Sequence, residues 1–451
     1  MDLIAAIATG SAATAIGIIR LSGDGCFAAC DRVFRPRNGR PFADQPSHKM
    51  VFGEMLDETG AVIDQGLAVR FGGGHSYTGE DSAEFYCHGS PVVLRELLSA
   101  LFAAGARQAG PGEFTRRAFL NGRLDLTEAE AVVDLIDAET AAAARNAAAQ
   151  LHGALRRDFE AVTERLLDIT SRFYAVVDYP DEDIQDIQPQ EIRQALRDCD
   201  ATLSRLLDTC GRGRILKSGV RTAIIGRPNA GKSSLLNALA GYERCLVTDI
   251  PGTTRDTVEE KAVLGGVLLR LIDTAGLRET GDVVEQMGVR RSLDALERAE
   301  LALVVLDGSA PLDDNDKMVL DAAGQVEECI ILVNKSDLPQ QADLSGLAQA
   351  PLAISAKEGT GLDALEAEIA RRFPAGAEQQ GELLTNARQA EAAQRAEQAL
   401  EAVRDGLEAG MSPDAVLSDV EFAMAALAEV TGRRVTEDVT ARIFSRFCVG
   451  K

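Results

Sequence analysis

The chain has 451 residues, 46% of them hydrophobic, and its 47 basic and 70 acidic residues give a net charge of −23. This length predicts about three domains, and the acidic charge argues against a protein that coats nucleic acid, because phosphate contacts need clustered Lys and Arg. No apolar stretch approaches the roughly 20 residues of a membrane span and the N-terminus lacks a basic signal-peptide region, so we expect a cytoplasmic protein without a membrane anchor.

The first part of the chain, residues 1–118, alternates β-like and helical segments. Apolar, β-branched runs at 15–21, 67–71 and 82–87 are typical of strands, and a helical pattern follows at 91–104. We therefore expect a small N-terminal α/β domain.

From Leu124 the composition changes to Ala, Glu and Leu. Apolar residues recur at steps of three and four from Leu151 to Val176, which predicts one long helix that ends at 178–181. A second stripe from Ile192 to Leu206 predicts another helix before Gly211. This all-α texture covers residues 119–215.

The next segment contains a phosphate-binding loop. Residues 226–233 read G-R-P-N-A-G-K-S and follow the apolar run 222–225. In G-x-x-x-x-G-K-[ST], two glycines let the backbone wrap a phosphate at a helix N-terminus. Lys232 then reaches the β- and γ-phosphates and Ser233 ligates Mg²⁺.

Three later motifs occur in the order of a GTPase domain, which we place at residues 216–373. They are Asp273-Thr274-Ala275-Gly276, Asn334-Lys335-Ser336-Asp337 and Ser355-Ala356-Lys357. A carboxylate at Asp273 can hold the Mg²⁺ water shell, and Gly276 lets its N–H approach the γ-phosphate. Asp337 can accept two hydrogen bonds from guanine, whereas adenine lacks that pair of donors, so the sequence predicts GTP.

The residue after Gly276 is Leu277, which cannot orient the attacking water as the glutamine of Ras-type GTPases does. The acidic residues of the following loop, Glu279, Asp282 and Glu285, are candidates for that role. Asn229 together with the segment 248–254 also suits a monovalent cation, which would supply the charge of an arginine finger.

Helical texture returns at residues 374–451, with patterns at 390–407, 413–430 and 436–447. Neither helical half looks able to cover its apolar stripe alone. We therefore expect one discontinuous helical domain with the GTPase domain inserted in it.

The phosphate loop, Thr253-Thr254-Arg255-Asp256, Asp273 to Arg278, the segment Pro111 to Leu126 and the terminal Phe447-Cys448-Val449-Gly450-Lys451 together resemble the MnmE (TrmE) family of tRNA modification GTPases. The resemblance covers nearly the whole chain. It implies a homodimer joined through the N-terminal domain, which binds 5-formyl- or methylene-tetrahydrofolate. It also implies an FAD-dependent partner, MnmG (GidA), in a heterotetramer that adds an aminomethyl or carboxymethylaminomethyl group to C5 of the wobble uridine of tRNA.

The resemblance also assigns residues. Folate would contact Arg20, Glu84, Arg123 and Lys451. Mg²⁺ would be held by Ser233 and Thr254, and K⁺ by Asn229, Thr248, Ile250 and Thr253. Glu285 matches the catalytic glutamate, beside Lys232. The residues expected to bind GTP are Asn229, Ala230, Gly231, Lys232, Ser233, Ser234, Thr248, Asp249, Ile250, Pro251, Gly252, Thr253, Thr254, Asp273, Thr274, Ala275, Gly276, Asn334, Lys335, Asp337, Ser355, Ala356 and Lys357.

Two alternatives remain at this point. A regulatory GTPase of ribosome assembly would share the GTPase motifs and Leu277, although it would not need the segment Pro111 to Leu126 or the terminal Cys-x-Gly-Lys. A folate-binding structural subunit with an incidental GTPase is the other.

Overall fold

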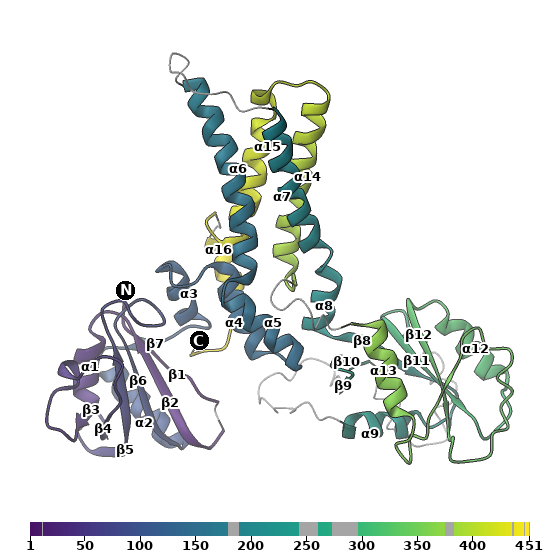
Figure 1. Cartoon of the computed structure of the whole chain (residues 1–451). Helices are drawn as coiled ribbons and strands as arrows, with labels where there is room; N and C mark the ends of the chain where they lie inside the picture. Colours follow the sequence, from purple (N-terminus) through teal and green to yellow (C-terminus); the bar gives the residue numbers. More distant parts are fainter. Residues whose placement is uncertain are drawn as a thin grey trace. The chain divides into compact units, whose positions relative to one another are not determined.

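A computed structural model of the chain describes residues 1–10, 12–178, 189–242, 260–272, 296–374, 383–434, 437–445 and 447–450. Its backbone contacts define two compact units (Figure 1). The first comprises Met1–Val133, Gln150–Cys199 and Arg395–Lys451, and the second Asp134–Ala149 and Asp200–Gln394. Among the described residues, every helix is too short or too polar to span a bilayer.

The first unit begins with a seven-stranded sheet in the order β3-β4-β5-β6-β2-β1-β7. Its strands are β1 (Ile4–Ile7), β2 (Thr14–Ser22), β3 (Phe34–Pro36), β4 (Val51–Leu56), β5 (Val62–Phe71), β6 (Ser82–Gly89) and β7 (Arg107–Gln108). Three helices accompany them, α1 (Cys26–Val33), α2 (Pro91–Ala103) and α3 (Glu113–Leu120), with a short 3₁₀ turn at Phe42–Asp44. The predicted N-terminal α/β domain is confirmed.

Alternation along the strands gives this sheet two different faces. Ile19, Phe85 and Ala68 are fully buried in one cluster with residues of α1 and α2. Their strand neighbours Arg20 and Glu84 point to the opposite face and form a cross-strand pair between β2 and β6. The face opposite α1 and α2 is thus where polar side chains of the sheet gather.

The helical part contains α4 (Leu126–Ile136), α5 (Ala141–Leu151), α6 (Ala154–Asp178), α7 (Pro189–Leu207), α14 (Ala387–Glu408), α15 (Pro413–Thr431) and α16 (Glu437–Phe444). Within the first unit, α6 packs along α15. The predicted long helix is confirmed as α6, but it begins at Ala154 and not at Leu151, because Gly153 has a left-handed φ of 75° and its N–H closes a turn onto Gln150. A residue in that conformation cannot continue a right-handed helix.

The last residues of the chain lie against the N-terminal domain inside the first unit. Phe444 and Phe447 are buried with Ala129. Val449 forms a bridge with Pro111, and the N–H of Gly112 donates to the carbonyl of Cys448. A Cβ on Gly450 would lie 2.3 Å from the carbonyl oxygen of Ile7, so a side chain at that position would clash.

The second unit contains a six-stranded sheet in the order β13-β12-β11-β8-β10-β9. Its strands are β8 (Val220–Ile225), β9 (Glu260–Leu264), β10 (Val267–Leu271), β11 (Leu301–Asp307), β12 (Glu328–Asn334) and β13 (Leu352–Ala353), and all pairs are parallel except β9 with β10. The accompanying helices are α8 (Cys210–Ser218), α9 (Lys232–Tyr242), α12 (Asp314–Ala323) and α13 (Leu362–Arg372).

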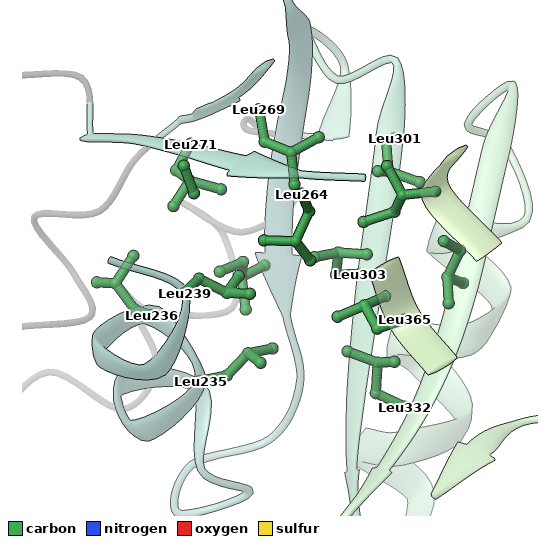
Figure 2. Close-up of a cluster of buried hydrophobic side chains, with 14 of the residues drawn as sticks. Leu235, Leu236, Leu239, Leu264, Leu269, Leu271, Leu301, Leu303, Leu332 and Leu365 are labelled. Carbon is green, nitrogen blue, oxygen red and sulfur yellow. The ribbon is translucent and has the colours of Figure 1, made fainter. Parts of the chain in front are cut away.

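Both faces of this sheet are covered, as expected of a parallel sheet. Every residue of β11 is buried. Leu301 and Leu303 pack on one face with leucines of α9 and α13, including Leu365 (Figure 2). Ala302 and Val304 pack on the other face with residues of α12 and the loop after it. This arrangement fixes the carboxyl ends of β8, β11 and β12 along one edge.

Two strands of this sheet are also tied to the loop between α4 and α5. Glu139 of that loop lies 2.8 Å from Nζ of Lys261 on β9 and 3.8 Å from Nη2 of Arg270 on β10. These strands carry the chain out of the segment 243–259 and into the segment that begins at Asp273. The second unit therefore joins the GTPase sheet to a piece of the helical part.

Replacing Arg117 of α3 with Met should weaken the N-terminal domain. The Arg117 side chain is 3% exposed, and its guanidinium donates to Asp2, Glu80 and Glu113 at 2.7–3.0 Å. Removing one partner of a buried ionic network leaves uncompensated charge and costs roughly 3–5 kcal/mol. Hydrogen exchange of the amides of β1 and α3 should show this loss as a lower free energy of local opening.

The matched control is Arg35→Met, because the Arg35 side chain is 60% exposed and pairs with Glu54 at the surface. This change should cost less than about 1 kcal/mol. Equal losses of protection in the two variants would contradict the structural role of Arg117.

Candidate functional site

The phosphate loop joins β8 to α9 in the second unit. β8 ends at Ile225, α9 begins at Lys232, and the loop between them has left-handed φ values at Asn229 (60°) and Gly231 (98°). A Cβ on Gly231 would lie 2.0 Å from Nδ2 of Asn334. The second glycine is therefore required both by its φ and by its close contact with Asn334 at the end of β12.

Lys232 closes this loop from its first helical position. Its Nζ donates to the carbonyl oxygens of Gly226 and Arg227 at 2.7 and 2.8 Å. Burial lowers the pKa of the Lys232 ammonium to about 8. Phosphate oxygens are stronger acceptors than carbonyls, so this ammonium is well placed for a triphosphate in the loop.

The side chain of Asn334 links the loop to the base-recognition motifs. Asn334 ends β12 and is 3% exposed. Its Nδ2 donates to the carbonyl of Ala230 and its Oδ1 accepts from the N–H of Ala356, both at 2.9 Å. One buried amide thus holds the phosphate loop, the N-K-S-D motif and the S-A-K motif together.

Asp337 lies two residues beyond Lys335. It accepts a hydrogen bond from Oγ of Ser355 at 2.7 Å, and this bond lowers the pKa of the Asp337 carboxyl. Lys335 has a left-handed φ of 66°, and its Nζ lies 2.6 Å from Asp307 at the end of β11. The exposed carboxylate at Asp337 is therefore ionised and positioned to accept hydrogen bonds.

The structure thus brings together the predicted residues Asn229, Ala230, Gly231, Lys232, Asn334, Lys335, Asp337, Ser355 and Ala356. Ser233 and Ser234 follow Lys232 in α9, and Lys357 follows Ala356. The other nucleotide-site predictions lie outside the described residues. These are Thr248, Asp249, Ile250, Pro251, Gly252, Thr253, Thr254, Asp273, Thr274, Ala275, Gly276 and Glu285.

Sequence reasoning did not single out Arg227 and Asp307. The signal for Asp307 is a charged residue at the carboxyl end of an otherwise apolar strand, next to the strand that ends in Asn334. Ligands of open α/β sheets bind outside the carboxyl ends of the strands. Arg227 occupies a variable position of the loop motif, so nothing local indicates its role.

A second candidate site lies in the first unit, on the polar face of the N-terminal sheet. A pocket of about 180 Å³ is lined by Arg20, His48, Phe71, His75, Ser76, Tyr77, Thr78, Ser82 and Glu84. The pocket wall combines an ion pair, aromatic rings and hydroxyl groups. This mixture suits a flat, polar ligand.

The Arg20–Glu84 pair forms the charged part of this pocket. Nε of Arg20 donates to Oε1 of Glu84 at 2.8 Å, and Tyr86 Oη donates to Oε2 at 2.6 Å. Burial and the adjacent Glu84 raise the pKa of Tyr86 to about 12, so its hydroxyl stays a donor. The Arg20 guanidinium also lies 5.5 Å from the centre of the Tyr77 ring. Both partners are thus fixed in place.

The other two predicted folate residues are placed differently. Arg123 is exposed, and its Cγ would lie 3.2 Å from a Cβ on Gly79, the residue after Thr78 of the pocket. It flanks the pocket and does not line it. Lys451 lies outside the described residues, although Gly450 before it is placed against Ile7.

Comparisons with known proteins agree over the whole chain. Residues 3–123 match the family model of the GTP-binding protein TrmE N-terminus, and residues 126–448 match that of the MnmE helical domain. The tRNA modification GTPases MnmE of Symbiobacterium thermophilum and Heliobacterium modesticaldum are 46% and 44% identical, over 100% of this chain and 99% of theirs. A solved structure of Aquifex aeolicus Era with GDP and AlF₄⁻ matches 40% of this chain and 66% of its own at 25% identity, with a TM-score of 0.26.

We predict that Gly231→Ala weakens GTP binding by at least about tenfold. The methyl group would displace Asn334 from the loop, and a non-glycine residue with left-handed φ costs a further 1–2 kcal/mol or so. Calorimetric titration with a non-hydrolysable GTP analogue would measure the change.

Gly241→Ala provides the control for this substitution. Gly241 lies in α9, and a Cβ there would meet no atom within 4 Å. This variant should bind the analogue as the wild type does. Unchanged affinity of Gly231→Ala would show that the contact with Asn334 does not shape the nucleotide site.

Proposed function

The chain belongs to the MnmE family of tRNA modification GTPases, and we propose that it uses GTP hydrolysis at the phosphate loop to drive one-carbon chemistry at the N-terminal pocket. It is a GTPase that acts in tRNA modification and binds GTP with Mg²⁺. This identity favours a modifying enzyme over a regulatory GTPase of ribosome assembly. The observation that carries the proposal is that Arg20 and Glu84 form an ion pair in the pocket of the N-terminal sheet.

At the nucleotide site, Lys232 contacts the β- and γ-phosphates and Asp337 accepts hydrogen bonds from guanine. Ser233 is an exposed residue in the first turn of α9, and its hydroxyl is a hard oxygen ligand of the type that Mg²⁺ prefers. Bound Mg²⁺ neutralises charge that develops on the phosphates. Glu285 orients the attacking water in place of Leu277, and single-turnover hydrolysis by Glu285→Ala tests this role: an unchanged rate would exclude it.

A potassium ion completes the site at Asn229. The side chain of Asn229 is exposed on a left-handed turn of the loop, where a neutral amide oxygen can join the ligands expected from Thr248, Ile250 and Thr253. Bound K⁺ supplies positive charge beside the phosphates, as an arginine finger does in other GTPases.

At the N-terminal pocket, the carboxylate of Glu84 accepts hydrogen bonds from the N–H groups of a pterin ring. Each oxygen of Glu84 already has one donor, and a carboxylate has about four acceptor positions, so two remain for a ligand. Arg123 beside the pocket is a cation available for the acidic tail of the folate, and we assign the same role to Lys451. We propose 5-formyl- or methylene-tetrahydrofolate as the ligand.

The pocket is smaller than the roughly 300–1,000 Å³ of a typical small-molecule site. It therefore holds part of a folate, and a second copy of the chain completes the site. The sheet face supports this dimer. Phe52, Leu67 and Tyr86 stand opposite one another on β4, β5 and β6, on the same face as Glu84, and Phe52 and Leu67 are exposed. Burial of this apolar row favours association.

The reaction also needs a partner. We propose that the homodimer works with MnmG, which brings FAD, in a heterotetramer that binds tRNA. The product is a wobble uridine with an aminomethyl or carboxymethylaminomethyl group at C5. We place the protein in the cytoplasm, where its tRNA substrate is found.

Glu84→Gln should weaken binding of 5-formyl-tetrahydrofolate by at least about tenfold and leave GTP hydrolysis unchanged. The amide loses charge-assisted hydrogen bonds worth roughly 1.5–3 kcal/mol each. Calorimetry measures the affinity, and mass spectrometry of tRNA nucleosides from complemented cells should show loss of the modified uridine. Glu96→Gln, a change at an exposed position of α2 on the other side of the sheet, is the control and should retain both. Normal folate affinity of Glu84→Gln would exclude this pocket.

Hydrolysis of GTP should be at least about tenfold faster in K⁺ than in Na⁺, and Asn229→Ala should remove the difference. The reason is that the cation supplies transition-state charge stabilisation, which is worth up to roughly 10³–10⁵ in rate when an arginine does it. Phosphate release assays in the two salts give the comparison, with Asn315→Ala on α12 as a control that should keep it. Equal rates in K⁺ and Na⁺ for the wild type would rule out the potassium site.

A further inference from the structure

Arg227 follows the first glycine of the phosphate loop, and its side chain turns away from solvent into a group of acids. The side chain is 15% exposed. Its guanidinium lies 3.7 Å from Asp307, 3.4 Å from Asp313 and 3.4 Å from Asp316. The side chain of Arg227, and not only its backbone, therefore makes specific contacts beside the loop.

The acids are themselves fixed by their elements. Asp313 caps α12, with its side chain accepting from the N–H groups of Asn315 and Asp316, and Asp316 completes the capping box. Asp316 is fully buried, and its Oδ1 has no hydrogen-bond partner among the described residues. These carboxylates therefore hold fixed positions next to Arg227 at the N-terminus of α12.

Asp307 connects this acidic cluster to the N-K-S-D motif. Its Oδ1 accepts from the N–H and Oγ of Ser309 at 3.0 and 2.6 Å. Its Oδ2 faces Arg227 on one side and Nζ of Lys335 at 2.6 Å on the other. One carboxylate thus lies between a cation of the phosphate loop and a cation of the N-K-S-D motif.

The backbone of Arg227 completes the connection. Its carbonyl oxygen accepts a hydrogen bond from Nζ of Lys232 at 2.8 Å. A continuous series of polar contacts therefore runs from Lys232 through Arg227 and Asp307 to Lys335. Asp337, two residues on, is the carboxylate that reads guanine in the nucleotide site proposed above.

We propose that Arg227 is a positioning residue that couples the grip on the phosphates to the recognition of the guanine base. The inference rests on the nucleotide site of the proposed function. Arg227 and Lys335 hold the carboxylate of Asp307 between them. This fixes Lys335 and the turn after it, so that Asp337 is positioned to accept hydrogen bonds from guanine. Without the guanidinium, three carboxylates share Lys335, and the lysine is drawn toward Asp313 and Asp316.

If the two are coupled, a substitution of Arg227 in the phosphate loop should reduce the preference for guanine over other bases. Inosine triphosphate lacks the exocyclic amine of GTP but carries the same phosphates, so the ratio of the two affinities reports on the hydrogen bond to Asp337. The wild type should prefer GTP by about tenfold or more, because a hydrogen bond to a charged group is lost with inosine.

The test compares binding of non-hydrolysable GTP and inosine triphosphate analogues to the full-length wild type and to Arg227→Met. We expect Arg227→Met to bind GTP more weakly and to reduce the preference to about threefold or less. Arg227→Lys should recover part of the preference, because an ammonium keeps the charge but not the fork. Circular dichroism and thermal unfolding establish that each variant is folded.

Arg221→Met is the matched control, because Arg221 lies near the start of β8, away from the loop, is 55% exposed and pairs with Glu300. It should keep the wild-type ratio. Equal loss of both affinities in Arg227→Met, with the ratio unchanged, would overturn the coupling and leave the nucleotide site intact. A wild type without preference for GTP would overturn the site itself.

Discussion

The nucleotide site depends on one buried amide. Asn334 reaches from the end of β12 to the phosphate loop through Ala230 and to the S-A-K motif through Ala356. Both hydrogen bonds lie in a place with little access to water, where an unmade bond costs the full desolvation of the group. The close approach of Gly231 to the same amide explains why three loops from separate parts of the chain keep a common geometry.

The parallel sheet makes that contact possible. β8, β11 and β12 are neighbours, so the phosphate loop, Asp307 and Asn334 emerge along one edge. Buried apolar residues on both faces fix the strands between α9 and α13 on one side and α12 on the other. On the same sheet, Glu139 pairs with Lys261 and Arg270, so β9 and β10 are anchored to the loop between α4 and α5.

The N-terminal pocket is formed by the alternation of side chains along antiparallel strands. Its two charged residues stand opposite each other on antiparallel strands, and the alternation of the strands sends them to the face that α1 and α2 leave open. The same alternation places the exposed Phe52 and Leu67 on that face. A polar pocket and an apolar row thus lie on one surface of the sheet, as the proposed dimer requires.

The sequence by itself determined the phosphate loop, the choice of guanine, the class of each domain and most helices, because these follow from local spacing and from the period of apolar residues. It misplaced the start of α6, since the left-handed turn at Gly153 interrupts an apolar stripe that continues across it. Only the tertiary structure decided which charges meet. Arg20 and Glu84 are 64 residues apart, and Arg227, Asp307 and Lys335 come from three separate segments of the chain. Such pairs depend on which strands are neighbours, and no local pattern in the sequence encodes that order.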